Sequence, residues 1–160
     1  IILLGAGGAA RGAAVECLQR RCASLWIANR TRENLDALLA TIAPVAGGIP
    51  VRGFAPGEIP RDLPADALVI NATSAGLRDT DPLPIDLTAL PRPAAVFDMI
   101  YNPPQTGLLK AAASLGLPIA NGLSMLIHQG AKALEIWTGI SATRTAPTMG
   151  AAARAAMAAK

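Results

Sequence analysis

Two glycines and an alanine near the start of the chain have the spacing of a phosphate-binding turn. Gly5, Gly7 and Ala10 fit the pattern Gly-x-Gly-x-x-Gly/Ala, between a short apolar run and an alanine-rich stretch. In such a strand–turn–helix, the first glycine permits the tight turn and the second lets a pyrophosphate approach the backbone. The small third residue lets the helix pack close to the strand. The free N–H groups of the first helical turn, with the helix dipole behind them, then face the anion. An ordinary glycine-rich turn also fits this spacing, but the two flanks favour a dinucleotide site.

The residues about 20 positions further along indicate which dinucleotide is bound. An NAD site usually has Asp or Glu there, which accepts hydrogen bonds from the ribose hydroxyls. This chain has Asn29 and Arg30 instead. A carboxylate would repel a 2′-phosphate, whereas the planar, permanently charged guanidinium of Arg30 matches one. Thr31 can donate a hydrogen bond and Arg32 is a second candidate cation. A surface arginine at a helix start is the alternative, but a cation there opposes the helix dipole. The segment therefore predicts NADP.

Apolar runs alternate with helical patterns along the whole chain. Strands are predicted at 1–4, 24–28, 49–54, 67–70, 94–99 and 117–120, and helices at 9–21, 33–42, 106–115, 122–137 and 147–160. The strands are continuously apolar rather than alternating, which is typical of a parallel sheet covered on both faces. We predict an α/β protein with a Rossmann-type doubly wound sheet of about six parallel strands. It should have three α/β/α layers and the strand order 3-2-1-4-5-6.

Polar residues follow several of these strands and should meet at one edge of the sheet. Ligands of doubly wound folds bind outside the carboxyl ends of the strands. The ends of the fourth, fifth and sixth strands carry Asn71 and Thr73, then Asp98, Met99 and Tyr101, then Asn121 and Gly122. Loops are polar in most proteins, but the residue types at these ends fit a cofactor edge. Asn29 or Thr31 can cap the helix that begins at 33.

The predicted helix 122–137 places Gln129 on the same face as Gly122. Seven steps of 100° return to within about 20° of the starting direction, so this face would point along the cleft. Gln129 could equally bond a loop backbone, and both interpretations remain open. His128 points elsewhere and is expected to be solvent-facing or locally satisfied. The remaining apolar residues of the helix look like core: Leu123, Leu126, Ile127, Leu134 and Trp137.

Composition excludes several classes of protein. The 160 residues are 52% hydrophobic, enough for one domain with a core, and the net charge of +3 comes from scattered arginines without a basic run. We therefore expect no nucleic-acid partner. We find neither a membrane-spanning run nor a signal peptide and expect a soluble, cytoplasmic protein. Cys17 and Cys22 would point about 140° apart on one helix and should stay unpaired, buried thiols. With one histidine, no metal-ligand set is apparent.

Five stretches together resemble the shikimate dehydrogenase family. They are Gly5–Arg11, Asn29–Thr31, Asn71–Gly76, Asp98–Pro103 with Thr106, and Asn121–Leu126 continuing through Gln129 to Trp137–Gly139. They stand in the family's order and cover almost the whole chain. The first is shared with many dehydrogenases, and Asn-Arg-Thr also occurs in glutamyl-tRNA reductase. The last two are far more specific and carry the resemblance.

The resemblance implies the carboxyl-terminal cofactor domain of an NADP-dependent enzyme. That enzyme interconverts 3-dehydroshikimate and shikimate in aromatic amino-acid synthesis. It implies these cofactor residues: Gly5, Ala6, Gly7, Gly8 and Ala9 for the pyrophosphate, Asn29, Arg30 and Thr31 with Arg32 for the 2′-phosphate, Thr73, and Met99 and Gly122 beside the nicotinamide. Tyr101 and Gln129 would reach the substrate. Asp98 and Asn71 would tie loops together.

The family's catalytic Lys–Asp pair is not matched in this chain. In the family this pair lies in an amino-terminal substrate domain, and Lys110, Lys132 and Lys160 match no catalytic motif. Residue 1 already lies in the first strand and is not Met. We therefore expect residues 1–160 to be the NADP-binding domain of a longer, two-domain enzyme, with the last helix, 147–160, packing toward the other domain.

Without the other domain, residues 1–160 are expected to bind the cofactor but not to catalyse the reaction. Ketone reduction needs a hydride donor and a proton donor close together, so the chain alone should bind NADP(H) without turning over shikimate. A monomer or a homodimer is expected. One alternative is a quinate or quinate/shikimate dehydrogenase. Another is a non-catalytic, dehydrogenase-like regulatory module, against which the intact glycines and phosphate clamp argue.

Overall fold

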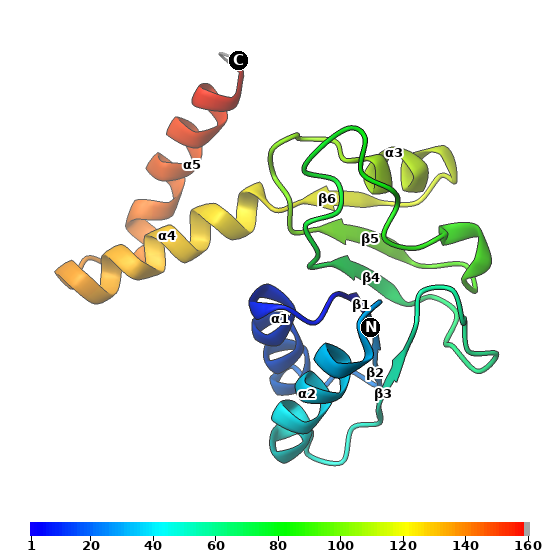
Figure 1. Ribbon diagram of the computed structural model, residues 1–160. Coiled ribbons are helices and arrows are strands. Elements are labelled where there is room, and N and C mark those ends of the chain that lie inside the picture. Colours follow the sequence, from blue (N-terminus) through cyan, green and yellow to red (C-terminus); the bar gives the residue numbers. More distant parts are fainter. Residues whose placement is uncertain (159–160) are drawn as a thin grey trace. The chain divides into compact units, whose positions relative to one another are not determined.

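Six parallel strands form one sheet in the first part of the chain (Figure 1). The computed structural model describes residues 1–158. The strands are β1 (Ile2–Leu4), β2 (Leu25–Ala28), β3 (Val51–Phe54), β4 (Leu68–Asn71), β5 (Ala95–Asp98) and β6 (Ile119–Asn121). They lie in the order β3-β2-β1-β4-β5-β6, and every neighbouring pair is parallel. The predicted α/β class and strand order are confirmed.

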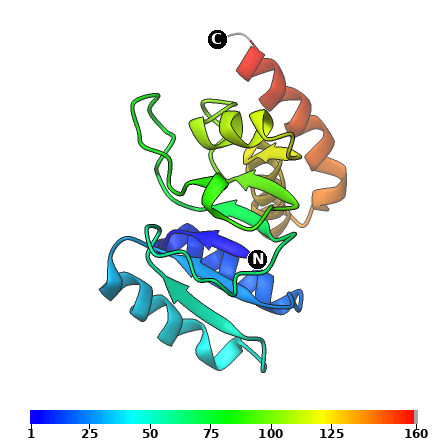
Figure 2. The same cartoon turned by 90° about the vertical axis from the view of Figure 1, so that its right-hand side faces the viewer.

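Strands β1 and β2 are buried on both faces, because other segments of the chain cover the sheet on each side (Figures 1 and 2). Leu3 of β1 packs in a core with α1 (Gly8–Gln19) and α2 (Arg32–Ile42). Its neighbours Ile2 and Leu4 point the other way, into a core that includes α3 (Gly107–Ser114). Successive side chains of a strand alternate between faces, so a continuously apolar strand needs a cover on each side. The predicted three layers are present.

The segment 77–93 contributes to the core that contains Ile2 and Leu4. A short 3-10 turn, η1 (Ala43–Val45), follows α2. The segment 77–93 is irregular apart from a similar turn, η2 (Leu87–Ala89). Ile85, Leu87 and Leu90 are nevertheless buried in the core under β4 and β5. These apolar anchors attach the segment to the sheet between its exposed polar stretches.

Residues from Gly122 onward form a second compact unit. Its helices α4 (Leu123–Thr138) and α5 (Ala142–Ala158) pack on each other around Ile127, Ala131 and Ala146. Trp137 was predicted as core, and this is wrong, because its side chain is 79% exposed. Ten steps of 100° separate it from Ile127, so it lies about 80° away from the buried face.

The prediction that the last helix begins at Pro147 is also wrong. Helix α5 begins at Ala142 and contains Pro147, while residues 159 and 160 lie outside the described part of the chain. Ser141 precedes the helix, and its Oγ accepts a hydrogen bond from the Thr143 N–H at 3.3 Å. A proline removes one helical hydrogen bond. The packing of Ala146 and Met149 on α4 outweighs that cost.

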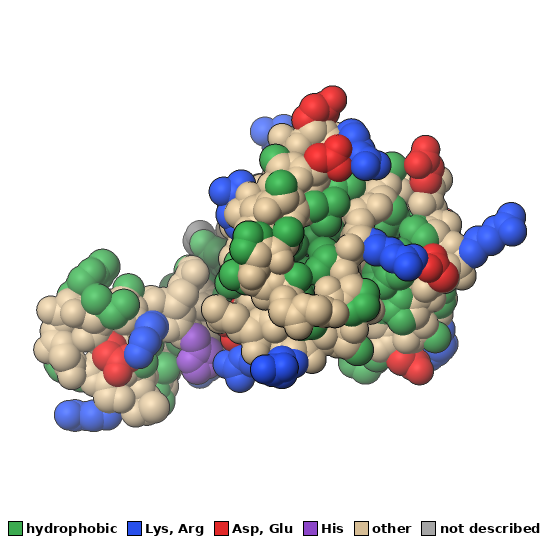
Figure 3. Space-filling view, turned by 90° about the horizontal axis from the view of Figure 1, so that it is seen from below, with side chains coloured by type: hydrophobic (Ala, Val, Ile, Leu, Met, Phe, Trp, Pro, Cys, Tyr) green, Lys and Arg blue, Asp and Glu red, His purple; other side chains and the backbone are tan. Residues whose placement is uncertain are grey.

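The surface carries charges of both signs. Figure 3 shows Lys and Arg scattered among Asp and Glu on the face that it presents. No helix within residues 1–158 is long and apolar enough to cross a membrane. His128 is exposed, as predicted.

Helix α1 ends in a turn that corrects the predicted position of Cys22. The chain reverses at Arg21, whose φ of 55° is left-handed, and the Cys22 N–H donates to the Cys17 carbonyl at 3.1 Å. This is a Schellman-type helix end. Cys22 therefore lies beyond the helix, and the angle predicted between the two cysteines does not apply. Both thiols are free and half-buried.

Replacing Arg21 by glycine should stabilise the protein. A left-handed conformation costs an L-residue about 1–2 kcal/mol, part of which glycine returns as unfolded-state entropy. We expect Arg21→Gly to raise the free energy of unfolding by about 1 kcal/mol in urea titrations. The matched control is Gly116→Ala, since Gly116 (φ 70°) follows α3 and a Cβ there would touch nothing. It should lose about 1 kcal/mol. A lower stability of Arg21→Gly would contradict this account.

Candidate functional site

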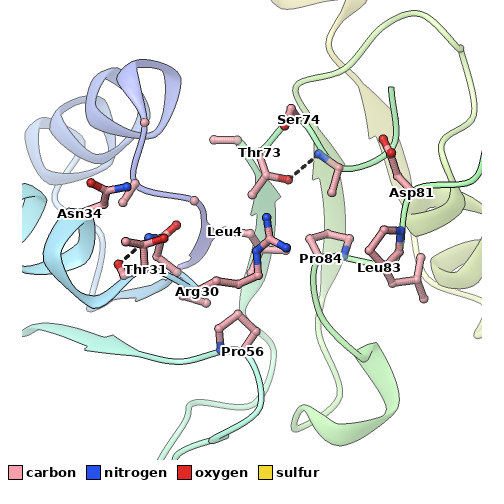
Figure 4. A pocket seen from close by; sticks show the side chains of 18 residues that line it. Leu4, Arg30, Thr31, Asn34, Pro56, Thr73, Ser74, Asp81, Leu83 and Pro84 are labelled. Atoms are coloured by element: carbon pink, nitrogen blue, oxygen red, sulfur yellow. Dashed lines mark hydrogen bonds between the residues drawn. The ribbon is translucent and has the colours of Figure 1, made fainter. Parts of the chain in front are cut away.

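A cleft of about 760 Å³ opens at the carboxyl ends of β1, β2 and β4 (Figure 4). Four segments form most of its lining: Leu4–Gly7, Ala28–Thr31, Ala72–Ala75 and Asp81–Pro84, joined by Asn34 and Pro56. Strand β1 has β2 on one side and β4 on the other, so the cleft sits where the strand order reverses. Ligands of doubly wound sheets bind at this switch point.

Gly5 is required by both its conformation and its surroundings. Its φ is 108°, and a Cβ there would lie 3.0 Å from the Ala72 carbonyl oxygen and 3.1 Å from Thr73 Cγ2. The turn after β1 therefore lies directly against the end of β4. Ala10 is fully buried against the sheet. The predicted tight turn and close helix packing are both present.

The N-terminus of α1 is left open toward the cleft. Gly7 is its N-cap residue, and no side chain caps the first-turn N–H groups. A Cβ on Gly7 would meet nothing within 4 Å, so the space beside it is free for a ligand. An uncapped helix N-terminus attracts anions through its N–H groups and dipole.

Arg30 extends from the end of β2 into the cleft (Figure 4). It takes part in none of the ion pairs found in residues 1–158, whereas Arg32 pairs with Asp36 at 2.9 Å. That pairing raises the pKa of Arg32. Thr31 occupies the N-cap position of α2, but its side chain makes no capping hydrogen bond. Asn29 Nδ2 donates instead to the Thr31 carbonyl at 2.8 Å. The predicted capping by these side chains is therefore not found.

The opposite wall is held by Asp81 and by a buried polar network. Asp81 Oδ2 accepts hydrogen bonds from the N–H groups of Gly76 and Arg78, both at 3.0 Å. Below the wall, Asn71 Nδ2 donates to Asp98 Oδ1 at 3.0 Å, and Thr106 Oγ1 donates to Asp98 Oδ2 at 2.6 Å. All three network residues are buried. The prediction that Asn71 and Asp98 tie loops together agrees with these contacts.

Comparison with known proteins decides the family. The family model described as the shikimate 5′-dehydrogenase C-terminal domain matches residues 122–146. The NADP(+) shikimate dehydrogenase of Methylobacterium radiotolerans is 41% identical over 138 residues, which are 86% of this chain and 47% of that protein. That of Rhodospirillum rubrum is 38% identical over 156 residues, 98% of this chain and 53% of that protein. The chain belongs to the shikimate dehydrogenase family.

Solved structures of the shikimate dehydrogenase family share the fold. The enzyme of Thermus thermophilus, in complex with NADP(H) and shikimate, has a TM-score of 0.76 and 32% identity, covering 97% of this chain and 54% of that chain. A quinate dehydrogenase from Corynebacterium glutamicum, in complex with NAD, has a TM-score of 0.77 and 29% identity, covering 92% and 53%. The chain spans about half the length of the curated relatives it matches.

The structure brings some of the predicted family residues together in the cleft and leaves others outside it. The lining includes Gly5, Ala6, Gly7, Asn29, Arg30, Thr31 and Thr73. Gly8 and Ala9 lie in the exposed first turn of α1, and Arg32 lies on an exposed face of α2. Met99 follows β5, half-buried, and Tyr101 is exposed. Gly122 and Gln129 belong to the second unit. The binding roles of all these residues stay predictions.

Sequence reasoning missed the loop Asp81–Pro84, Pro56 and Asn34. The loop comes some ten residues after β4, and it reaches the cleft because Ile85 and Leu87 anchor it in the core. The one available signal was Asp81 between Gly76 and two prolines, Pro82 and Pro84, since aspartate commonly bonds nearby backbone N–H groups in such turns. Within the described residues, no group of three or more His, Cys, Asp or Glu could hold a metal ion.

Gly5→Ala should destabilise the fold strongly. The added Cβ would be strained by the positive φ and would press on the Ala72 carbonyl. We expect a loss of about 2–4 kcal/mol in the free energy of unfolding, measured by urea denaturation. Gly7→Ala is the matched control and should lose less than about 1 kcal/mol, because the space at Gly7 is open. Equal losses at both positions would refute the close approach.

The loop at Asp81 should loosen in acid. The N–H groups of Arg78 and Gly76 hold the pKa of Asp81 below its ordinary value. A lowered folded pKa means that the ionised carboxylate stabilises the loop above the ordinary aspartate pKa, and this is lost as the pH falls through the lowered pKa. In NMR titrations the Gly76 and Arg78 amide shifts should move together with a midpoint below that of a free aspartate. Asp81→Asn should abolish the titration, and a midpoint at or above the ordinary value would contradict the assignment.

Proposed function

We propose that the cleft binds NADP(H) and that the chain is the cofactor domain of a shikimate dehydrogenase. The proposal rests mainly on the position of Arg30. Its side chain extends into the cleft and takes part in none of the ion pairs found in residues 1–158. Two relatives of the chain are named shikimate dehydrogenase (NADP(+)). The reaction would be the interconversion of 3-dehydroshikimate and shikimate in aromatic amino-acid synthesis.

The residues at the cleft fit the phosphate groups of this dinucleotide. The bare backbone at Gly7 and the uncapped first turn of α1 would take the pyrophosphate, alongside Gly5 to Ala9. Arg30 would hold the 2′-phosphate with Asn29 and Thr31. Arg32 is the weaker candidate, because it already pairs with Asp36. No acidic residue follows β2 at the position where NAD sites usually have one.

Other residues would place the reacting groups. We propose that Met99 and Gly122 border the nicotinamide and that Tyr101 and Gln129 reach the substrate, as their family motifs imply. The bound cofactor would supply the hydride. In the described lining of the cleft there is no lysine, and the carboxylate of Asp81 is engaged by two backbone N–H groups. The proton donor would therefore come from another domain.

The relatives' additional length supports such a domain. This chain covers 47% and 53% of two relatives. In the second unit the apolar side chains of Ile136, Trp137 and Ile140 are exposed, and we propose that this unit, including its last helix, contacts an amino-terminal substrate domain. A cytoplasmic monomer or homodimer remains the prediction. The fold is also shared with a quinate dehydrogenase in complex with NAD, so quinate is the second candidate substrate.

The chain by itself should bind NADP(H) but not oxidise shikimate. Hydride transfer needs a partner proton acceptor, which the cleft lining does not offer. Calorimetry with NADP⁺ tests the binding. An absorbance assay with shikimate and NADP⁺ tests the absence of oxidation. Substantial turnover by the isolated chain would overturn it.

Arg30→Ala should weaken the binding of NADP⁺ but not that of NAD⁺. We expect the affinity for NADP⁺ to fall by about 1.5–3 kcal/mol, the range for hydrogen bonds to charged groups, and that for NAD⁺ to stay nearly unchanged. Dissociation constants from calorimetry provide the measurement. Arg32→Ala is the matched control and should cost NADP⁺ binding much less, because Arg32 is exposed and paired. Equal losses for both dinucleotides would show that Arg30 does not read the 2′-phosphate.

A further inference from the structure

The amide of Asn71 uses all of its hydrogen-bonding capacity. Its Nδ2 donates to Asp98 Oδ1 at 3.0 Å and to the Ala75 carbonyl at 3.2 Å. Its Oδ1 accepts from the Thr73 N–H at 3.0 Å and from Thr73 Oγ1 at 2.7 Å. An amide offers two donors and two acceptor lone pairs. With each of them engaged, the Asn71 side chain has one orientation.

Asp98 fixes that orientation from the end of the next strand. Besides the Asn71 amide, its carboxylate accepts the Ile100 N–H at 3.0 Å and the Thr106 hydroxyl at 2.6 Å. Thr106 in turn accepts the Leu109 N–H at 3.3 Å, as the N-cap of α3. Asp98 is fully buried, and its three contacts are all donors, which suits an acceptor-only carboxylate. We call Asn71, Asp98 and Thr106 the buried network.

The buried network holds the loops that follow β4 and β5. Through Asn71 it holds Thr73, which lines the cleft. Through Asp98 it holds the Ile100 N–H, between Met99 and Tyr101, and the Met99 N–H donates to the Asn71 carbonyl at 2.9 Å. In a doubly wound fold the pyrophosphate lies after β1 and the adenosine ribose after β2. The rest of the dinucleotide then extends over β4 and β5.

Thr73 has no hydroxyl donor left for a ligand. Its Oγ1 donates to Asn71 Oδ1 and accepts the Ala75 N–H at 3.1 Å. Its Cγ2 methyl lies on the glycine-turn side, 3.1 Å from where a Cβ of Gly5 would be. The hydroxyl thus fixes the orientation of the Thr73 side chain in the cleft wall, and it has no hydrogen left to donate to the cofactor.

We propose that the buried network is a positioning device for the nicotinamide half of the bound dinucleotide, with Asp98 and Thr106 as positioning residues. The proposal rests on the NADP(H) function proposed above. Neither residue lines the cleft. Their effect is transmitted through Asn71 to Thr73 and through Ile100 to the segment 99–101.

The test compares NADP⁺ with adenosine 2′,5′-bisphosphate, which carries the 2′-phosphate but lacks the nicotinamide half. Thr106→Val removes one donor to Asp98, and Thr106→Ser retains it. For Thr106→Val we expect the dissociation constant of NADP⁺ to rise at least about fivefold, as for loss of one net hydrogen bond, and that of the fragment to change less than about twofold. The fluorescence of bound NADPH should change as well. Thr106→Ser should restore both.

Two further variants complete the test. Thr88→Val is the matched control, because Thr88 Oγ1 donates to Asp86 at 2.7 Å in a similar Thr–Asp pair that lies outside the network and is exposed. It should leave both affinities unchanged. If circular dichroism shows that Thr106→Val is unfolded, Thr73→Val, on the half-buried wall, takes its place with the same expected pattern.

The outcomes separate the two proposals. Equal weakening of NADP⁺ and the fragment would mean a general loss of structure and would overturn the positioning role. Unchanged NADP⁺ binding by a folded variant would also overturn it, while the proposed function would stand. If the unaltered chain bound neither ligand, both proposals would fall.

Discussion

The close contact between the turn after β1 and the end of β4 is the constraint on which the site depends. A Cβ on Gly5 would press on the Ala72 carbonyl at 3.0 Å, so the two backbones can meet only because residue 5 is glycine. This contact places the open N-terminus of α1 beside Thr73 and leaves the cleft at the reversal of strand order. Small residues are used where backbones must approach, and Ala10, in the first turn of α1, is likewise buried against the sheet.

The two halves of the cleft are built from different kinds of interaction. On the β2 side, Asn29–Thr31 are held by one local amide–carbonyl bond, and Arg30 is exposed. On the β4 side, buried polar groups satisfy one another, and the cost of leaving any of them unpaired fixes their geometry. The guanidinium fork of an arginine matches a phosphate, and a fully satisfied buried network makes its surroundings rigid. This division matches the proposed adenosine and nicotinamide halves.

Much of the fold followed from the sequence because its signals are local. Continuous apolar runs mark strands with two covered faces, and the glycine spacing marks the first turn. Local signals failed where packing decided. Pro147 is typical of a helix start, but α5 begins at Ala142, directly after Ser141. Ala146 and Met149, on either side of the proline, pack against α4. Trp137 reads as core, yet it lies beside the buried face of α4.

The sequence by itself determined the fold class, the family and the residues with phosphate-binding chemistry, because each of these depends on residue type and spacing along the chain. Tertiary structure alone decided which of those residues share a cleft. It brought Asp81–Pro84 to the site through apolar anchors, paired Arg32 with Asp36 while leaving Arg30 in the cleft, and turned the Thr73 hydroxyl toward Asn71. Such choices depend on contacts between segments far apart in the chain, where burial and hydrogen-bond satisfaction select one arrangement.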